Sequence, residues 1–283
     1  MSKLKFTKMQ GLGNDFVVVE ENELSYISIS RPELAQKLCD RRFGIGADGL
    51  MIIQDKATET DFEWDFYNSD GSVAEMCGNG IRCFAKYLFE NGFTDKKQFT
   101  VNTLAGVITP EINDDGTVTV NMGNPVFEAK KVPVVADVSP VLGQKILAKD
   151  REFIFTAISM GNPHCVIFEP KETEKLALEY GRDIEFSPIF PKKTNVEFVE
   201  VISKNEIKID VWERGCGITK ACGTGACASV VAAILNNLTN DEVVVILPGG
   251  ALKIKWAGSI GDLKQDVFMT GPAEFVFLGE WLL

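Results

Sequence analysis

Histidine is almost absent from this chain, since His164 is the single one among 283 residues. None of the seven cysteines stands in a C-x-x-C pair, so a structural zinc site is a poor interpretation. Long apolar runs are also lacking. The N-terminal run at 16–19 is too short for a signal-peptide core, and the weakly polar stretch at 221–235 is too short to span a bilayer. We therefore expect a soluble, cytoplasmic protein whose cysteines form no disulfide framework.

Positive charge is scarce as well. The chain has 29 Lys and Arg against 40 Asp and Glu, which gives a net charge of −11. Non-specific binding to nucleic acid or to an anionic membrane needs clustered positive charge, so both kinds of partner are excluded. A hydrophobic content of 45% and a charged content of 24% are typical of a globular protein. The length suggests about two domains.

The pattern of apolar residues in the first half predicts the order strand, strand, helix, strand, strand, helix. Ser30 with Glu33 forms a capping box that opens the first helix, and Gly92 follows the second helix as its C′ residue. A hairpin turn is predicted at 113–116. The predicted strands are 4–9, 15–20, 50–54, 62–67, 107–112 and 117–122, and the second helix covers about 77–91.

The second half repeats this order. A helix from Glu172 is expected to end at Gly181, and a second helix starts at about Cys222 and runs to Asn237. The predicted strands are 153–160, 165–168, 195–202, 207–212, 243–247 and 251–256.

A duplication is visible at the level of single residues. The motif Cys-Gly-x-Gly begins at Cys77 and again at Cys222, and Gly-Asn begins at Gly13 and again at Gly161. A polar residue precedes each of the two cysteines by the same spacing, at positions 68 and 213. The next cysteines, at 83 and 227, do not align with each other, and we interpret them as thiols that pack within the helices.

A cysteine at a helix N-terminus lies near the positive end of the helix dipole, which is expected to lower its pKa. The glycines after it leave backbone N–H groups free to bind an anion such as a carboxylate. Two such units could invert a carbon centre, with one thiol removing a proton and the other returning one, and no cofactor is required. An isolated cysteine is more often buried and inert, but packing alone does not explain why cysteine occurs at the same helix-start position in both halves.

Several longer motifs resemble those of the diaminopimelate epimerases, and the resemblance covers nearly the whole chain. The motifs are KMQGLGNDF at 8–16, RFGIGADG at 42–49, NSDGS at 68–72, MCGNGIR at 76–82, GNPH at 161–164, TNVEF at 194–198, WERG at 212–215 and ACGTG at 221–225.

The resemblance implies an α/β fold of two pseudo-symmetric domains, each a mostly antiparallel strand layer or barrel around a central helix. The expected domains are 1–122 with 269–283, carrying Cys77, and 123–268, carrying Cys222. It further implies that the chain interconverts LL- and meso-diaminopimelate without pyridoxal phosphate, on the route to lysine and peptidoglycan. The implied partner is this small-molecule substrate, and the oligomeric state, a homodimer included, stays open.

Carried over by motif, Cys77 and Cys222 are the acid–base pair, and His164 and Glu213 tune them. A bidentate guanidinium at Arg214 suits the far carboxylate of the substrate, and Glu213 can also accept from an ammonium. The residues that the resemblance places in the substrate pocket are Asn14, Asn68, Gly78, Asn79, Asn162, Asn195, Glu213, Arg214, Gly223 and Thr224. No metal ligand is implied.

Two residues depart from the usual family pattern. Cys216 adds a thiol near the expected site, and Lys220 could perturb Cys222 electrostatically. The segment 44–49 fits the dinucleotide G-x-G-x-x-G pattern by letter only, because it follows a predicted helix and precedes a strand.

Two rival hypotheses remain at the level of sequence. One is a proline racemase-like enzyme, which carries histidine where this chain has Asn79. The other is a binding protein or redox sensor built on a decayed epimerase, against which the intact duplicated motifs argue.

Overall fold

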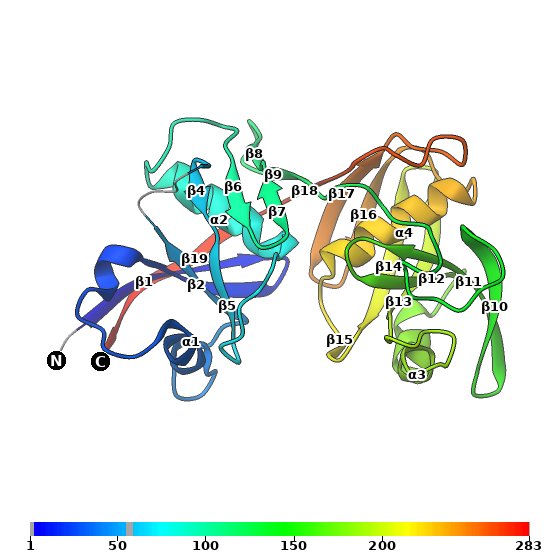
Figure 1. Ribbon diagram of the computed structural model, residues 1–283, viewed down its shortest axis with the longest axis horizontal. Coiled ribbons are helices and arrows are strands. Elements are labelled where there is room, and N and C mark those ends of the chain that lie inside the picture. Colours follow the sequence, from blue (N-terminus) through cyan, green and yellow to red (C-terminus); the bar gives the residue numbers. More distant parts are fainter. Residues whose placement is uncertain (1–2, 55–58, 283) are drawn as a thin grey trace. The chain divides into compact units, whose positions relative to one another are not determined.

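The computed structural model describes residues 3–54 and 59–282. The chain divides into two compact units. The first comprises Met1–Val120 with Gly271–Leu283 and contains Cys77, and the second comprises Asn121–Thr270 and contains Cys222. Each unit is built from strands and two α-helices (Figure 1).

The main sheet of the first unit has the strand order β19-β1-β2-β3-β5. Its neighbours pair antiparallel except β2 and β3, which are parallel. A smaller sheet has the order β4-β6-β7, and β8 pairs antiparallel with β9. The strands are β1 (Lys3–Gly11), β2 (Asn14–Glu20), β3 (Gly49–Ile53), β4 (Phe62–Glu63), β5 (Asp65–Asn68), β6 (Val101–Thr103), β7 (Gly106–Ile108), β8 (Glu111–Ile112), β9 (Val118–Asn121) and β19 (Glu274–Leu282).

Two α-helices and a short 3-10 helix, η1 (Glu21–Leu24), complete this unit. As predicted, Ser30 caps α1 (Arg31–Cys39) by accepting from the Glu33 backbone N–H. Helix α2 (Gly78–Glu90) packs against β1, β2 and β8. Most of its apolar residues are buried, and Asn79 at its start donates to Asn14 at the start of β2.

In the second unit, neighbouring strands follow the order β10-β11-β12-β13-β14-β16-β17-β18, with β15 paired to β14. The pairs β12–β13 and β14–β16 are parallel and the others antiparallel. The strands are β10 (Val141–Ala148), β11 (Arg151–Ser159), β12 (Pro163–Phe168), β13 (Asn195–Ser203), β14 (Glu206–Glu213), β15 (Gly217–Ile218), β16 (Glu242–Leu247), β17 (Gly250–Trp256) and β18 (Val267–Gly271).

The strands of this unit surround helix α4 (Gly223–Leu235), which contacts β11, β12, β13, β14, β16 and β17 (Figure 1). Small and β-branched residues dominate α4, and nearly all of them are buried, as expected of a helix that is apolar on every side. Helix α3 (Thr173–Glu185) packs on β13, β14 and β10. The expected α/β fold, with a repeated half built around a helix, is confirmed.

Three local predictions were wrong. Helix α3 continues four residues past Gly181, because that glycine faces Trp212 and a Cβ there would lie 2.5 Å from the Trp212 Cβ. The glycine therefore serves close packing and does not cap the helix. The predicted strand at 62–67 is divided at Trp64 into β4 and β5, which lie in different sheets. The predicted strand at 107–112 is also divided, into β7 and β8, although the turn at 113–116 forms.

Within the described parts of the chain, 3–54 and 59–282, no helix is long and apolar enough to cross a membrane.

Candidate active site

The two Cys-Gly-x-Gly motifs form the same local structure. Cys77 is the N-cap of α2 and Cys222 the N-cap of α4, both with extended backbone angles. The Sγ of Cys77 accepts from the Gly80 N–H at 3.4 Å, and the Sγ of Cys222 accepts from the Gly225 N–H at 3.3 Å. Each sulfur therefore satisfies one of the N–H groups that a helix start leaves unpaired.

Close packing explains the second glycine of each motif. A Cβ on Gly225 would lie 2.9 Å from Oε1 of Glu197, and a Cβ on Gly80 would lie 3.1 Å from the Trp64 ring. A side chain at either position would push the helix start away from its surroundings.

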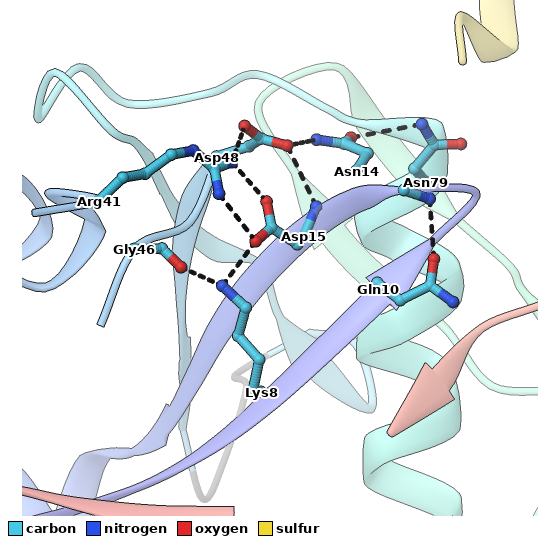
Figure 2. Close-up of polar contacts among 9 residues, drawn as sticks. Lys8, Gln10, Asn14, Asp15, Arg41, Gly46, Asp48 and Asn79 are labelled. Carbon is cyan, nitrogen blue, oxygen red and sulfur yellow. Dashed lines mark hydrogen bonds and ion pairs between the residues drawn. The ribbon is translucent and has the colours of Figure 1, made fainter. Parts of the chain in front are cut away.

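The thiol of Cys77 faces the β1–β2 turn. Its Sγ lies 3.7 Å from Oδ1 of Asn14, and the same oxygen accepts from Nδ2 of Asn79 at 3.3 Å. On its other side, Asn14 donates through Nδ2 to Oδ2 of Asp48 at 2.6 Å (Figure 2). Asn14 thus contacts both Cys77 and Asn79, so three residues of the predicted site lie together within one unit.

Behind Asn14 lies a charged cluster that the sequence reasoning did not assign (Figure 2). Lys8 pairs with Asp15 at 2.7 Å, and Arg41 pairs with both Asp15 and Asp48 at 2.7 Å. The Lys8 ammonium also donates to the Gly46 carbonyl. Burial tends to raise the pKa of Asp15, but hydrogen bonds from Arg41 and Lys8 outweigh it and lower that pKa to about 2. All four charged residues lie in the 8–16 and 42–49 motifs or beside them, so these two motifs were the sequence signal that could have identified the cluster.

Asn68 lies at the end of β5, where it pairs with Gly49 of β3, the residue after Asp48, and where the Ser69 N–H donates to the Asp48 carbonyl at 3.1 Å. The Nδ2 of Asn68 donates to the Ser72 hydroxyl at 2.9 Å, and Gly71 donates to the Asn68 carbonyl, so Asn68 closes the turn at 68–72.

The surroundings of Cys222 contradict the expected lowering of its pKa. Burial raises the pKa of Cys222 well above its usual value, and the negative charges of Glu213 and Glu197 raise it further. The Thr224 hydroxyl, 3.7 Å from Sγ, and the Gly225 N–H lower the pKa of Cys222, but by less than burial and the two glutamates raise it. Desolvation therefore outweighs the helix start at this position, and the raised pKa favours the protonated form of the Cys222 thiol.

His164 is fully buried between two side chains. Its Nδ1 lies 2.7 Å from Oε1 of Glu197, and its Nε2 lies 2.9 Å from Oδ1 of Asn162. Asn162 in turn donates to the Thr224 hydroxyl at 3.2 Å. A chain of contacts therefore runs from Glu197 through His164, Asn162 and Thr224 to the Cys222 sulfur.

Glu197 was missed by the sequence reasoning, although it lies in the 194–198 motif. Its side chain has no exposed surface, and its Oε2 finds no hydrogen-bond partner among residues 3–54 and 59–282. A glutamate between the buried apolar residues Val196 and Phe198 of β13 was the signal that could have identified it.

Glu213 and Arg214 stand at the end of β14, where the chain turns through Gly215 and Gly217, both with positive φ. The Thr219 hydroxyl donates to Glu213. Burial raises the pKa of Glu213, an effect that Thr219 opposes and the charge of Glu197 reinforces.

Arg214 is exposed, and its guanidinium donates to the Lys192 carbonyl over a long distance of 3.4 Å.

Asn195 joins this turn to β12. It is buried, its Nδ2 donates to the Pro163 carbonyl at 2.9 Å, and its Oδ1 accepts from the Arg214 N–H at 2.9 Å. The Glu185 carboxylate holds the next residue, accepting from the Gly215 N–H at 3.0 Å. Asn195 therefore fixes the backbone on which His164 and Arg214 are carried.

The remaining cysteines differ from the two at the helix starts. Cys83 and Cys227 are fully buried, as predicted for packing thiols, and burial raises the pKa of Cys83 to about 12. Cys216 is exposed, and its pKa is raised by partial burial and by Glu213 and Glu185.

Lys220 is also exposed, and its carbonyl accepts from the Gly249 N–H. No group of His, Cys, Asp and Glu in the described part of the chain could hold a metal ion.

Comparison with known proteins identifies the family. The diaminopimelate epimerase family model matches residues 6–128 and 156–276, so it covers both units. The chain belongs to the diaminopimelate epimerase family. It is 49% identical to the diaminopimelate epimerase of Carboxydothermus hydrogenoformans, with 99% of this chain and 100% of that protein covered. It is 48% identical to the enzyme of Halothermothrix orenii, with 98% of each covered.

Solved structures show the same fold at low sequence identity. A phenazine biosynthesis protein of the PhzF family from Bacillus anthracis matches with a TM-score of 0.72 at 14% identity, over 100% of both chains. A hydroxyproline epimerase from Agrobacterium vitis matches with a TM-score of 0.66 at 14% identity, over 99% of this chain and 92% of that one.

Members of the diaminopimelate epimerase family are isomerases of lysine biosynthesis that interconvert LL- and meso-diaminopimelate. The resemblance seen in the sequence motifs is thereby confirmed.

Proposed function

We propose that this chain interconverts LL- and meso-diaminopimelate by proton transfer at the α-carbon, with Cys77 and Cys222 as the two acid–base groups. The observation that supports this most directly is the repeated N-cap geometry, in which a cysteine sulfur accepts from a backbone N–H at the start of α2 and again at the start of α4. Family membership supports the choice of substrate.

In the proposed reaction from LL-diaminopimelate, the Cys77 thiolate removes the α-proton. The electron pair of the broken C–H bond remains on the α-carbon and is delocalised into the adjacent carboxylate. The Cys222 thiol then gives its proton to the opposite face and becomes the thiolate, which inverts the centre. The raised pKa of Cys222 supports its role as donor in this direction, and the roles reverse for the return reaction.

Backbone donors stabilise the charge that develops on the substrate carboxylate. Gly78 and Asn79 begin α2, and Gly223 and Thr224 begin α4, so their N–H groups lie at the positive ends of the two helix dipoles. Binding these groups more strongly in the transition state than in the ground state accelerates the reaction.

The other proposed residues fall into two groups. His164 and Glu213 tune the thiols, which is supported by the effect of Glu213 on the pKa of Cys222. Arg214 pairs with the distal carboxylate of the substrate, and its exposed guanidinium is available for this. Asn14, Asn68, Asn162 and Asn195 complete the substrate site. We also place the reaction in the cytoplasm, since the seven free cysteines suit a reducing compartment.

A substrate screen tests this proposal. The purified full chain is incubated in deuterated water with LL-diaminopimelate, L-proline or trans-4-hydroxy-L-proline, and deuterium at the α-carbon is followed by mass spectrometry. We expect incorporation and inversion with diaminopimelate and none with the other two. Turnover of proline or hydroxyproline without turnover of diaminopimelate would contradict the proposal, and no turnover of any of them would indicate a binding protein.

A further inference from the structure

We infer that Glu185, the last residue of α3, is a positioning residue that fixes the direction in which Arg214 presents its guanidinium. The inference is carried by two hydrogen bonds that the Glu185 carboxylate accepts, one from Trp212 and one from Gly215. These two residues flank Glu213 and Arg214 in the chain. The inference deepens the proposed function and rests on it only for the contact of Arg214 with the distal carboxylate of the substrate.

Two N–H groups meet the Glu185 carboxylate, one at each oxygen. The indole Nε1 of Trp212 donates to Oε2 at 2.8 Å, and the Gly215 backbone N–H donates to Oε1 at 3.0 Å. Neither an indole N–H nor a backbone N–H can accept a hydrogen bond. A carboxylate satisfies both donors, whereas a glutamine has one acceptor oxygen and would leave one donor facing its NH₂ group.

The hydrogen bond from Gly215 restrains one of the two peptide groups on either side of Arg214. A peptide group is planar, so a hydrogen bond from its N–H restrains the whole plane. Glu185 holds the plane that follows Arg214. The plane that precedes it is held by Asn195, whose Oδ1 accepts from the Arg214 N–H at 2.9 Å. With both planes held, the φ and ψ angles of Arg214 are fixed, and with them the direction of its Cα–Cβ bond.

Packing does not hold this turn. Gly215 has a φ of 80°, and no atom of residues 3–54 and 59–282 lies within 4 Å of the place where a Cβ on Gly215 would be. The Arg214 side chain is exposed, and its contact with the Lys192 carbonyl is long, at 3.4 Å. The direction of the Arg214 side chain therefore depends on hydrogen bonds to the backbone of the turn.

The position of Glu185 in α3 does not by itself favour a carboxylate. The side chain is buried in the last turn of the helix, where the helix dipole is negative. A carboxylate is costly to bury unless it is hydrogen-bonded, and the Lys193 ammonium approaches it only to 3.9 Å. The two N–H groups of the turn supply the hydrogen bonds that this buried carboxylate needs.

The start of α3 is tied to β14 by another buried carboxylate. Oδ2 of Asp210 accepts from the hydroxyl of Thr173, the first residue of α3, at 2.6 Å. Asp210 lies within β14, whereas the contacts of Glu185 extend past the end of β14 to Gly215. The pair at the helix start therefore provides a matched control for a general loosening of α3.

The test combines hydrogen exchange with steady-state kinetics on the full chain. Glu185→Met keeps the length of the side chain and loses both acceptors, and Glu185→Gln loses one. In Glu185→Met we expect the backbone N–H groups of 213–217 to exchange at least about fivefold faster than in the wild type, measured by peptide mass spectrometry. We expect kcat/KM for LL-diaminopimelate to fall about tenfold, with smaller changes in Glu185→Gln. Thermal unfolding checks that each variant folds, and Glu185→Gln decides the question if Glu185→Met does not.

Two comparisons separate positioning from a general loss of structure. Thr173→Val removes the hydrogen bond at the other end of α3, so it should lower the unfolding temperature but leave exchange at 213–217 and kcat/KM unchanged. Arg214→Lys has already lost the guanidinium that Glu185 positions. Adding Glu185→Met to Arg214→Lys should therefore lower kcat/KM by no more than about threefold.

Faster exchange at 213–217 together with this non-additive loss of kcat/KM supports the inference. Wild-type exchange or wild-type kcat/KM in the Glu185 variants overturns it, and so does a tenfold loss in the Arg214→Lys background or an equal effect of Thr173→Val. A wild-type protein that does not epimerise diaminopimelate would contradict the proposed function, whereas the exchange comparison would still decide whether Glu185 fixes the backbone at Arg214.

Discussion

His164 and Glu197 form a pair with no exposed surface, in which Nδ1 of the histidine lies 2.7 Å from Oε1 of the glutamate. Asn162 contacts the other ring nitrogen, so the imidazole is held from both sides. A buried carboxylate is tolerated only when it is paired or hydrogen-bonded, which explains why the chain's single histidine stands at this position. The same carboxylate acts on the neighbouring thiol, since it is one cause of the raised pKa of Cys222.

Glu197→Gln keeps the shape of this pair but removes its negative charge. Burial and the charge of Glu213 contribute most to the raised pKa of Cys222, and the charge of Glu197 contributes next. Removal of the Glu197 charge should therefore lower the pKa of Cys222. We expect the pH profile of kcat to move toward lower pH and kcat at neutral pH to fall about tenfold. Glu200→Gln, on the same strand but partly exposed, is the matched control and should leave both unchanged. An unshifted profile in Glu197→Gln would show that this carboxylate does not act on the thiol.

Arg214→Lys keeps a positive charge but loses the planar fork that fits a carboxylate. We expect kcat/KM for diaminopimelate to fall at least about tenfold. The loss should be much smaller for any residual exchange on lysine, which lacks the distal carboxylate. Arg182→Lys, on α3 with its guanidinium over the Phe186 ring, is the control. Equal losses on both substrates would assign Arg214 a structural role instead.

Gly225→Ala should destabilise the second unit, because the new Cβ would lie 2.9 Å from Oε1 of Glu197 and 3.1 Å from the Cys222 sulfur. We expect a loss of about 1–3 kcal/mol in the free energy of unfolding, measured in urea. At Gly261 the nearest atom to a new Cβ is 3.9 Å away, so Gly261→Ala should change stability little. A similar loss in the two variants would argue against a clash at Gly225.

Asp15→Asn tests the charged cluster behind Asn14. The pKa of Asp15 in the folded protein is about 2, below its ordinary value of 3.8, so its ionised form stabilises the fold above pH 3.8. This stabilisation is lost as the pH falls toward 2. We expect the variant to be less stable than the wild type at pH 7 by about 1–2 kcal/mol, and the difference to shrink below pH 4. Asp262→Asn is the control, and a difference that is independent of pH would contradict this account of Asp15.

Much of this site could be predicted from the sequence, because its signals are local. The starts of α2 and α4 follow from the duplicated motifs at Cys77 and Cys222, and the turn after Glu213 follows from Gly215 and Gly217. These features depend on residues that are close together in the chain.

The missed features depend on partners far apart in the chain. Asp48 meets Asn14 across 34 residues, and Glu197 meets His164 across 33. The end of α3 was wrong because Gly181 packs against Trp212. The predicted shift of the Cys222 pKa had the wrong direction, because the helix start is visible in the sequence, whereas the burial that outweighs its effect is not.

Cys77→Ala and Cys222→Ala should each reduce epimerisation at least about a thousandfold while the protein still unfolds cooperatively at nearly the wild-type temperature. Neither sulfur belongs to a disulfide, so no cross-link is lost. Cys216→Ala, at an exposed thiol near Glu213, is the matched control and should retain activity. Near wild-type epimerisation in either N-cap variant would remove that thiol from the mechanism.

The most direct test of the two-base mechanism is the early isotope content of both diastereomers in deuterated water. LL-diaminopimelate is converted by the wild-type protein to a small extent, and the remaining substrate and the new meso product are separated and analysed by mass spectrometry. If one thiol removes the proton and the other returns a different one, the product carries one deuterium and the remaining substrate retains its protium. Deuterium appearing in the remaining substrate as fast as in the product would show that one group serves both faces, and would contradict the assignment of Cys77 and Cys222 as a pair.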